Sequence, residues 1–327
     1  MSSLAAPLVD LYGPIRDELA EAQRVFDAEL VSDFPFVNEW CARIRSYRGK
    51  MMRPAMLLLS GNASGELTPD HPTLAAVVEM VHTATLVHDD VLDDADERRR
   101  EPTIRCSDGN VTAVLLGDYL ISHAFHLCSG LDSQYVSRRV GATTNTVCEG
   151  ELLQNRESGN DGLSEARYLE IIERKTGALT ALACELGARQ AGADDRVVEA
   201  MAAYGLAVGA AFQIVDDVLD IVGDRREVGK TLGLDLALGK PTLATIHALA
   251  SAGMTAQSAL RAVVRGEGAC DVEQLRGWLA STGSVEYALS VATDQVNHAI
   301  RQLEVLPPSD ARSSLAALAE FIVHRRY

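Results

Sequence analysis

"AAYGLAVGAAFQIVDDVLDIVG", residues 202–223, is the stretch that decides the fold. Its apolar residues cover nearly the whole circumference of a helix and many of them are small, which is typical of a helix packed on all sides. One polar stripe interrupts this surface, made of Gln213, Asp216, Asp217 and Asp220. Because unpaired buried carboxylates cost free energy, the stripe needs a partner. The stretch therefore predicts a central helix that carries a site.

Helical periodicity continues on both sides of this stretch, and short clusters of Gly, Pro, Asp, Ser and Asn separate the apolar runs. The alternation typical of strands is absent. No Pro/Ser-rich linker or shift in composition divides the chain, so we predict a single all-α domain over residues 1–327. The predicted helices span 72–93, 111–128, 134–155, 165–190, 195–222, 242–251, 255–265, 271–281, 285–304 and 310–325, with one or two more before residue 60.

Composition narrows the class of protein and its partners. With 47% hydrophobic and 23% charged residues, the 327-residue chain has the composition of a globular protein that buries a sizeable core. A formal net charge of -16 argues against nucleic acid, because phosphate backbones are bound by clustered Lys and Arg. The cysteines lack metal-ligand spacing, which favours free thiols that fill the core in a reducing compartment. They are Cys41, Cys106, Cys128, Cys148, Cys184 and Cys270.

The N-terminus has no basic region followed by an apolar one, so we expect no signal peptide. No run approaches the roughly 18 to 20 apolar residues of a transmembrane segment. We therefore expect a cytoplasmic protein, which is still compatible with a peripheral contact on a membrane surface for product release.

The polar stripe has a counterpart in "VHDDVLDDADERRREPT", residues 87–103, which directly follows an apolar run. Residues three or four apart share a helix face, so each cluster is a row of carboxylates one turn apart. Such carboxylates repel each other unless a cation lies between them, and oxygen ligands without His or Cys suit Mg²⁺. Mg²⁺ keeps several waters and shares its site with phosphates, so we expect a phosphorylated ligand. The two rows are Asp89, Asp90 and Asp93, and Asp216, Asp217 and Asp220.

One aspartate run alone would be read as a solvated helix end, but two copies, each with an arginine pair some nine residues after its first aspartate, favour the metal sites. Cationic side chains that could balance a polyphosphate occur along the chain, although each lysine taken singly is more often a surface residue. Lys50 and Arg53 are three apart and are expected on one helix face. His82, two turns before the first row, is either a core histidine or a hydrogen-bond donor to a phosphate group. The remaining cations are Arg98, Arg99, Lys175, Lys230 and Lys240.

An ordered set of motifs makes the sequence closely resemble the trans-isoprenyl diphosphate synthases, the polyprenyl synthetase family. The resemblance covers nearly the whole chain, and this order of motifs is highly specific. The motifs are "GKxxRP" at 49–54, "HTATLVHDDVLD" at 82–93, "RR" at 98–99 with "PT" at 102–103, "GE" at 150–151, "KT" at 175–176, "FQIVDDVLD" at 212–220 and "GKTLGLDLALGKPT" at 229–242.

The resemblance implies a bundle of antiparallel helices around a deep central cavity, usually a homodimer. It implies head-to-tail condensation of an allylic diphosphate (geranyl, farnesyl or geranylgeranyl) with isopentenyl diphosphate. The aspartates of both rows would hold several Mg²⁺ ions on the allylic diphosphate, and an apolar tunnel would shield the carbocation from water. By the same resemblance, the allylic site would be completed by Arg98, Lys175, Thr176, Gln213 and Lys240, with Lys230 nearby, and isopentenyl diphosphate would be bound by Lys50, Arg53, His82 and Arg99.

Three places depart from the family pattern. Met51 stands where a cation is common, which would weaken one contact to isopentenyl diphosphate. Arg100 and Glu101 replace the usual Gly-Lys and leave the loop geometry open. Pro241 follows Lys240 at the expected start of a helix, where proline is tolerated.

Product length is indicated by the residues before the first motif, where bulky side chains stop chain growth in short-chain members of this family. Here these residues are Ala84 and Thr85, which favours a product of about seven to ten isoprene units (C35 to C50), with octaprenyl as the central expectation. A farnesyl or geranylgeranyl synthase with a deeper floor at Met80, Leu120 or Phe125 is the alternative. A class I terpene cyclase and an inactive partner subunit of a heteromeric synthase fit the motifs less well.

Overall fold

The structure is a computed structural model that describes residues 10–47, 49–99, 101–223, 236, 238–267 and 272–324. The all-α prediction is confirmed, since helices form nearly all of the described secondary structure. The chain forms two compact units, each described by itself below: unit 1 comprises residues 1–144, 179–205 and 301–318, and unit 2 comprises residues 145–178, 206–300 and 319–327. The single domain expected from the sequence stays a prediction.

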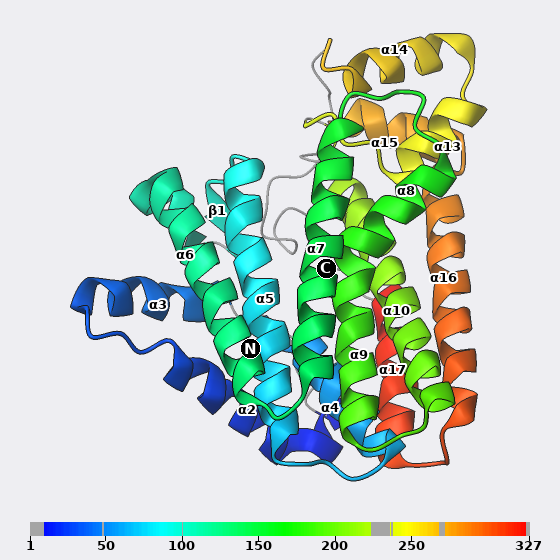
Figure 1. The fold of residues 1–327 in the computed structure, drawn as a ribbon. Helices are drawn as coiled ribbons and strands as arrows, with labels where there is room; N and C mark the ends of the chain where they lie inside the picture. The colour runs from blue at the N-terminus through cyan, green and yellow to red at the C-terminus, as the bar shows by residue number, and fades with distance from the viewer. Residues whose placement is uncertain are drawn as a thin grey trace. The chain divides into compact units, whose positions relative to one another are not determined.

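Unit 1 is organised around α5 (Asp70–Leu92), against which α2 (Arg16–Glu29), α4 (Met52–Ser64) and α6 (Ile104–Gly130) pack (Figure 1). The α5 side chains that face these neighbours, such as Leu74, Val77 and Met80, are fully buried. The apolar run before the first aspartate row is therefore core. The remaining elements assigned to this unit are a 3-10 turn (Gly13–Ile15), α3 (Pro35–Tyr47), β1 (Glu97–Arg98), β2 (Glu101–Pro102), the first part of α7 (Gln134–Arg156), α9 (Ala178–Gln190) from Leu179, the first part of α10 (Asp195–Val222), a 3-10 turn (Leu303–Val305) and most of α17 (Asp310–His324).

Unit 2 contains the second part of α10, from residue 206, whose Ala211, Ile214 and Val218 are buried as predicted. It also contains a π-helical turn at Glu173–Gly177, in the middle of the helix predicted over 165–190. The other elements of this unit are the second part of α7, α8 (Glu165–Ile172), α13 (Leu243–Ser251), α14 (Met254–Val264), α15 (Val272–Ser281) and α16 (Ser284–Gln302).

Four details differ from the sequence-based prediction. Among the described residues, α2, α3 and α4 all begin before residue 60, where one or two helices were expected. A short antiparallel pair, β1 with β2, occupies residues that showed no strand alternation, and Arg98 is opposite Glu101 in its register. A helical segment not expected from the sequence begins at Ile104, where the Thr103 side chain caps it, and a kink at the non-helical Gly109 (φ 85°) separates it from the rest of α6, whose start agrees with the predicted one near 111. Finally, α6 and α10 are long and apolar enough to cross a membrane by length and composition alone, a property that core helices of soluble proteins share.

Candidate active site

The first aspartate row lies at the C-terminal end of α5. Asp93 ends the helix, and its backbone N–H donates to the Asp89 carbonyl at 2.8 Å, so these two residues are one turn apart. Asp90 is different because its side chain is buried, with 1% of it exposed. Arg98 donates to Asp90 Oδ1 from Nε at 2.9 Å, and the Tyr47 hydroxyl donates to Asp90 Oδ2 at 2.7 Å. Both oxygens of this carboxylate therefore have protein partners.

Tyr47, the last residue of α3, connects the aspartate row to α6. Its hydroxyl accepts a hydrogen bond from the Ile104 backbone N–H at 3.1 Å, while its ring lies 6.0 Å from the Arg98 guanidinium carbon. Burial is the main cause that raises the pKa of Tyr47, so the phenol stays protonated and keeps donating to Asp90. One side chain thus satisfies the first amide of α6 and a carboxylate of α5.

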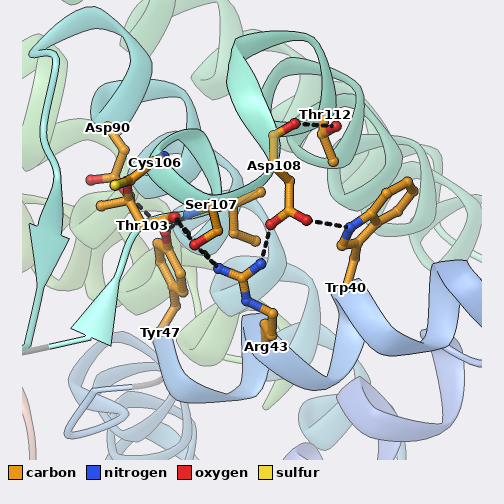
Figure 2. A network of polar contacts seen from close by, with 10 residues as sticks. Trp40, Arg43, Tyr47, Asp90, Thr103, Cys106, Ser107, Asp108 and Thr112 are labelled. Atoms are coloured by element: carbon orange, nitrogen blue, oxygen red, sulfur yellow. Dashed lines mark hydrogen bonds and ion pairs between the residues drawn. The ribbon is translucent and has the colours of Figure 1, made fainter.

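A network of polar contacts holds the chain that follows the row (Figure 2). Arg43 on α3 forms an ion pair with Asp108 and donates to Ser107 Oγ at 2.9 Å. Thr103 caps α6 by accepting from the Cys106 N–H at 3.1 Å, and its hydroxyl donates to the Ala95 carbonyl at 2.7 Å. Consequently the segment between the aspartates and α6 is fixed at both ends.

Three predicted cations gather around His82 in unit 1. Burial, and then the charges of Arg53, Arg98 and Arg99, hold the pKa of His82 well below its usual value, so its imidazole is neutral and can donate one N–H. Burial lowers the pKa of Arg53 and Arg99, and the buried Glu79 opposes this shift in both. Arg53 Nε is buried without a hydrogen-bond partner. The cluster has more positive charge than Glu79 can balance and is suited to an anion.

Arg99 is placed by its backbone and by Gly49. Its φ of 53° is left-handed, and a Cβ at Gly49 would lie 2.4 Å from Arg99 Nη2. The Gly-Lys motif therefore provides the space in which this guanidinium sits. Arg100, the first of the residues that leave the loop geometry open, lies outside the described residues, whereas Glu101 is exposed in β2.

The prediction that Lys50 and Arg53 share a helix face is wrong. The helix α4 begins at Met52, and Met51 before it has a left-handed φ of 51°, so Lys50 lies outside the helix. Met51 is also buried, with 5% of its surface exposed, which makes it part of the core. The Lys50 carbonyl accepts from the Tyr12 hydroxyl at 3.0 Å.

The second aspartate row lies on α10 in unit 2 and repeats one feature of the first. Asp217, 7% exposed, accepts from the Tyr168 hydroxyl at Oδ2 (2.7 Å) and from Gln213 Nε2 at Oδ1 (2.7 Å). Gln213 Oε1 in turn accepts from the Thr176 hydroxyl at 2.8 Å. Two predicted binding residues, Thr176 and Gln213, are therefore joined to the row by hydrogen bonds.

Lys175 lies in the π-helical turn, a local geometry that is frequent at functional sites. Its ammonium donates to Gln154 Oε1 at 2.9 Å and pairs with Glu151 Oε1 at 2.7 Å, both on α7. The close approach of α7 to the π-helical turn depends on Gly150, because a Cβ there would lie 2.6 Å from the backbone nitrogen of Lys175. The "GE" motif at 150–151 thus provides both the space and an acidic partner.

The other residues predicted in the second half of the chain are only partly described. Asp216 is half-buried and Asp220 is buried. Lys240 is half-buried and follows Gly239, whose carbonyl accepts from the Gly159 N–H at 2.8 Å. Pro241 is buried directly before Thr242, the N-cap of α13, which agrees with proline near a helix start. Lys230 lies outside the described residues.

The residues predicted to limit product length lie on α5. Ala84 is fully buried, while the Thr85 hydroxyl donates to the His82 carbonyl at 2.7 Å. Among the alternatives for a deeper floor, Met80 and Leu120 are fully buried and Phe125 is 37% exposed.

The donor set of the aspartate rows fits a hard divalent cation, since it consists of carboxylate oxygens that leave room for water and phosphate ligands. Within the described part of the chain, no three His, Cys, Asp or Glu side chains are grouped to hold a metal by themselves. In the first row, Asp90 does not join Asp89 and Asp93 in such a group because both of its oxygens are bonded, by Arg98 and Tyr47.

The comparisons with known proteins agree with this geometry. The family model described as polyprenyl synthetase matches residues 35–280. The chain belongs to this family. Its curated relatives are prenyl diphosphate synthases, and the chain is accordingly a trans-prenyltransferase. Among solved structures, this polyprenyl synthetase is similar to a Caulobacter crescentus polyprenyl synthase complexed with calcium and isoprenyl diphosphate, with a TM-score of 0.93 and 34% identity over 99% of this chain and 98% of that one.

Curated relatives of this polyprenyl synthetase make products of different lengths. The Rhodobacter capsulatus all-trans-nonaprenyl-diphosphate synthase is 35% identical over 97% of both chains. The Methanosarcina mazei geranylgeranyl diphosphate synthase is 33% identical over 85% of this chain and 86% of the relative. A Bacillus subtilis relative, 33% identical over 97% of this chain and 90% of its own length, is component 2 of a heptaprenyl diphosphate synthase. Membership of the family therefore does not fix the length of the prenyl product.

Proposed function

We propose that this polyprenyl synthetase condenses isopentenyl diphosphate head to tail with an allylic diphosphate, in the presence of Mg²⁺, to give an all-trans product of about C35 to C50. The observation that carries the proposal is the Arg53, His82 and Arg99 cluster on and beside α5, next to the first aspartate row. A cluster with surplus positive charge and several N–H donors is suited to the diphosphate of one substrate, while carboxylates at the helix end suit a metal-bound second diphosphate.

The residues divide into two groups by the substrate they would bind. Arg53, His82 and Arg99, with Lys50, would bind isopentenyl diphosphate. The neutral imidazole of His82 would donate a hydrogen bond to this diphosphate without adding a further positive charge to those of the three arginines. The allylic diphosphate would be bound by Arg98, Lys175, Thr176, Gln213 and Lys240, with Lys230 close by.

The aspartates Asp89, Asp93, Asp216 and Asp220, with Asp90 and Asp217 beside them, would hold Mg²⁺ with the allylic diphosphate. A divalent cation held by these carboxylates would supply stabilisation of the negative charge that develops on the departing diphosphate. Lys175 and Arg98 would add hydrogen bonds to the same leaving group. The small side chains of Ala84 and Thr85 support the long product.

A homodimer is supported by apolar residues left exposed in unit 1. On α6, Val111, Val114 and Leu115 are 74%, 41% and 62% exposed, an unusual position for adjacent aliphatic side chains. A second copy of the chain would bury them. The relative that is one component of a two-component synthase makes an unlike partner the alternative. A cytoplasmic location is part of the proposal.

The test is a synthesis assay with purified protein, Mg²⁺, labelled isopentenyl diphosphate and each of the C5, C10, C15 and C20 allylic primers. Chromatography of the products is expected to show a distribution centred near C40. Products that stop at C15 or C20 would replace the long-chain proposal with a short-chain synthase. No product with any primer would overturn the proposal that the chain acts without an unlike partner. Light scattering of the same sample measures whether it is a dimer.

A further inference from the structure

Two tyrosines outside the recognised motifs make the same contact in the two units. The Tyr47 hydroxyl donates to Oδ2 of Asp90 at 2.7 Å, and the Tyr168 hydroxyl donates to Oδ2 of Asp217 at 2.7 Å. Asp90 and Asp217 are each the second aspartate of a "DDVLD" sequence. Both tyrosines are buried, with 5% and 3% of their surface exposed. The contact is therefore repeated at equivalent positions of two different helices.

The other oxygen of each carboxylate accepts from a residue assigned to the allylic diphosphate. Arg98 donates to Asp90 Oδ1 from Nε at 2.9 Å and lies 2.8 Å from it with Nη2, and Gln213 Nε2 donates to Asp217 Oδ1 at 2.7 Å. A carboxylate held through both oxygens cannot rotate about its χ2 angle without losing one of these bonds. The phenol thus fixes the plane of the carboxylate, and the carboxylate fixes the donor on its far side.

Tyr47 and Tyr168 reach these carboxylates from other elements, α3 and α8. Tyr47 is also tied to α6, since its hydroxyl accepts from the Ile104 N–H at 3.1 Å. On the other side of Asp217, Gln213 accepts from Thr176 in the π-helical turn at 2.8 Å. Each tyrosine therefore holds its aspartate by a hydrogen bond from another helix. The helix that carries the aspartates does not provide this contact by itself.

We propose that Tyr47 and Tyr168 are positioning residues for the allylic diphosphate, each holding the second aspartate of its motif so that Arg98 and Gln213 are kept in their binding orientations. This inference rests on the proposed function, because it takes Arg98 and Gln213 as ligands of that substrate. It assigns a role to two residues that act through a carboxylate and do not touch the substrate.

The chain contains a matched control for each tyrosine. In unit 1 the Tyr135 hydroxyl donates to Glu185 Oε1 at 2.5 Å, and in unit 2 the Tyr287 hydroxyl donates to Glu165 Oε2 at 2.7 Å. Both are tyrosine–carboxylate hydrogen bonds that involve no residue of the aspartate rows. Tyr→Phe at these positions removes the same chemical contact without affecting a predicted substrate ligand.

The experiment compares Tyr47→Phe and Tyr168→Phe with Tyr135→Phe and Tyr287→Phe in the steady-state synthesis assay. Loss of a hydrogen bond to a charged group is expected to raise KM for the allylic diphosphate about tenfold, while KM for isopentenyl diphosphate changes less than about twofold and the controls change neither. Equal rises for both substrates, or no rise, in the two test variants would overturn the inference. So would the same rise in the controls.

A second measurement needs neither turnover nor metal. In the ligand-free protein, Tyr47→Phe removes the acceptor of the Ile104 N–H. Hydrogen exchange at this amide is expected to become faster in Tyr47→Phe and to stay unchanged in Tyr135→Phe. Unchanged exchange in Tyr47→Phe would show that the phenol does not hold this amide and would overturn the inference for Tyr47.

A double-mutant cycle tests whether Tyr168 acts through the carboxylate. Affinity for an unreactive allylic thiolodiphosphate with Mg²⁺ is measured by calorimetry for Tyr168→Phe, Asp217→Asn and the double variant. The double variant is expected to bind as weakly as Asp217→Asn alone, within about twofold. Multiplied losses would mean that Tyr168 acts independently of Asp217, which contradicts the inference. Wild-type protein without turnover would instead overturn the proposal that the chain acts without an unlike partner, so the two failures are distinguishable.

Discussion

The second aspartates of the two rows are both buried and both bonded to a tyrosine, but they differ in their other partner. Asp90 pairs with the guanidinium of Arg98, whereas Asp217 accepts from the neutral amide of Gln213. Asp90 is therefore bonded by a cationic donor, and the two side-chain donors that bond Asp217 at Oδ1 and Oδ2 are neutral. The difference teaches that a repeated sequence motif can be completed by different chemistry, which predicts different responses to the same substitution.

The largest expected difference is in stability. Asp90→Ala leaves Arg98, with 28% of its side chain exposed, without its acidic partner, and is expected to cost about 3 kcal/mol of unfolding free energy. Asp217→Ala removes the acceptor of two neutral donors, Gln213 and Tyr168, and is expected to cost about 1 to 2 kcal/mol. Urea unfolding of both variants measures this. Equal losses, or a larger loss for Asp217→Ala, would contradict the distinction between a charged and a neutral partner.

Ligand binding tests whether both rows serve one metal–diphosphate complex. With Mg²⁺ and a diphosphate analogue at 100 times its dissociation constant, the wild-type protein should gain about 2.7 kcal/mol in thermal stability. Asp89→Ala and Asp216→Ala should each lose most of this gain at the same ligand concentration. Thermal melting with and without ligand gives the comparison, and Asp310→Ala, an exposed aspartate at the start of α17, is the control. A full gain in Asp216→Ala would remove the second row from the metal site.

The packing behind Lys175 gives the next effect. Gly150→Ala would place a Cβ 2.6 Å from the backbone nitrogen of Lys175 and 2.9 Å from Arg174 Cβ. It is expected to destabilise the protein by about 1 to 3 kcal/mol. Gly141→Ala in the same helix, whose Cβ would meet Phe125 at 3.8 Å, is expected to stabilise by up to about 1 kcal/mol. Urea unfolding should therefore give shifts of opposite sign. Two shifts of the same sign would show that α7 and the π-helical turn are not closely packed.

The last effect is a pH dependence of stability that is expected from His82, which lies among three arginines in unit 1. Its folded pKa is lowered, so below about pH 6.5 the unfolded state binds a proton that the folded state does not. This contribution to stability is present above pH 6.5 and is lost by up to about 1.4 kcal/mol per pH unit as the pH falls. His82→Gln should flatten the dependence between pH 6.5 and 5. Parallel curves for variant and wild type would contradict a neutral imidazole at His82.

Sequence reasoning found most of the helices because their apolar periodicity is long and uninterrupted, as on α5 and α10. The aspartates of both rows also stand out in the sequence, since they are polar side chains on apolar helices, and their roles stay predictions. Sequence reasoning could not find Tyr47 and Tyr168, because a tyrosine at the end of α3 or within α8 shows its partner only after tertiary packing. For a similar reason the placement of Lys50 on a helix was wrong, since the left-handed φ of Met51 has no signature in a side chain that usually favours helices.

The contact between Gly49 and Arg99 has a practical consequence for altering this enzyme. A methyl group at position 49 would meet the far end of a flexible side chain, so the guanidinium could move aside while its charge stayed in the cluster. Under the substrate-binding role proposed for Arg99, position 49 is therefore a place where substrate affinity could be adjusted in small steps, by displacing a cation instead of deleting it. Directed evolution toward different substrate concentrations could begin with Gly49→Ala and Gly49→Ser, leaving every charged residue of the cluster intact.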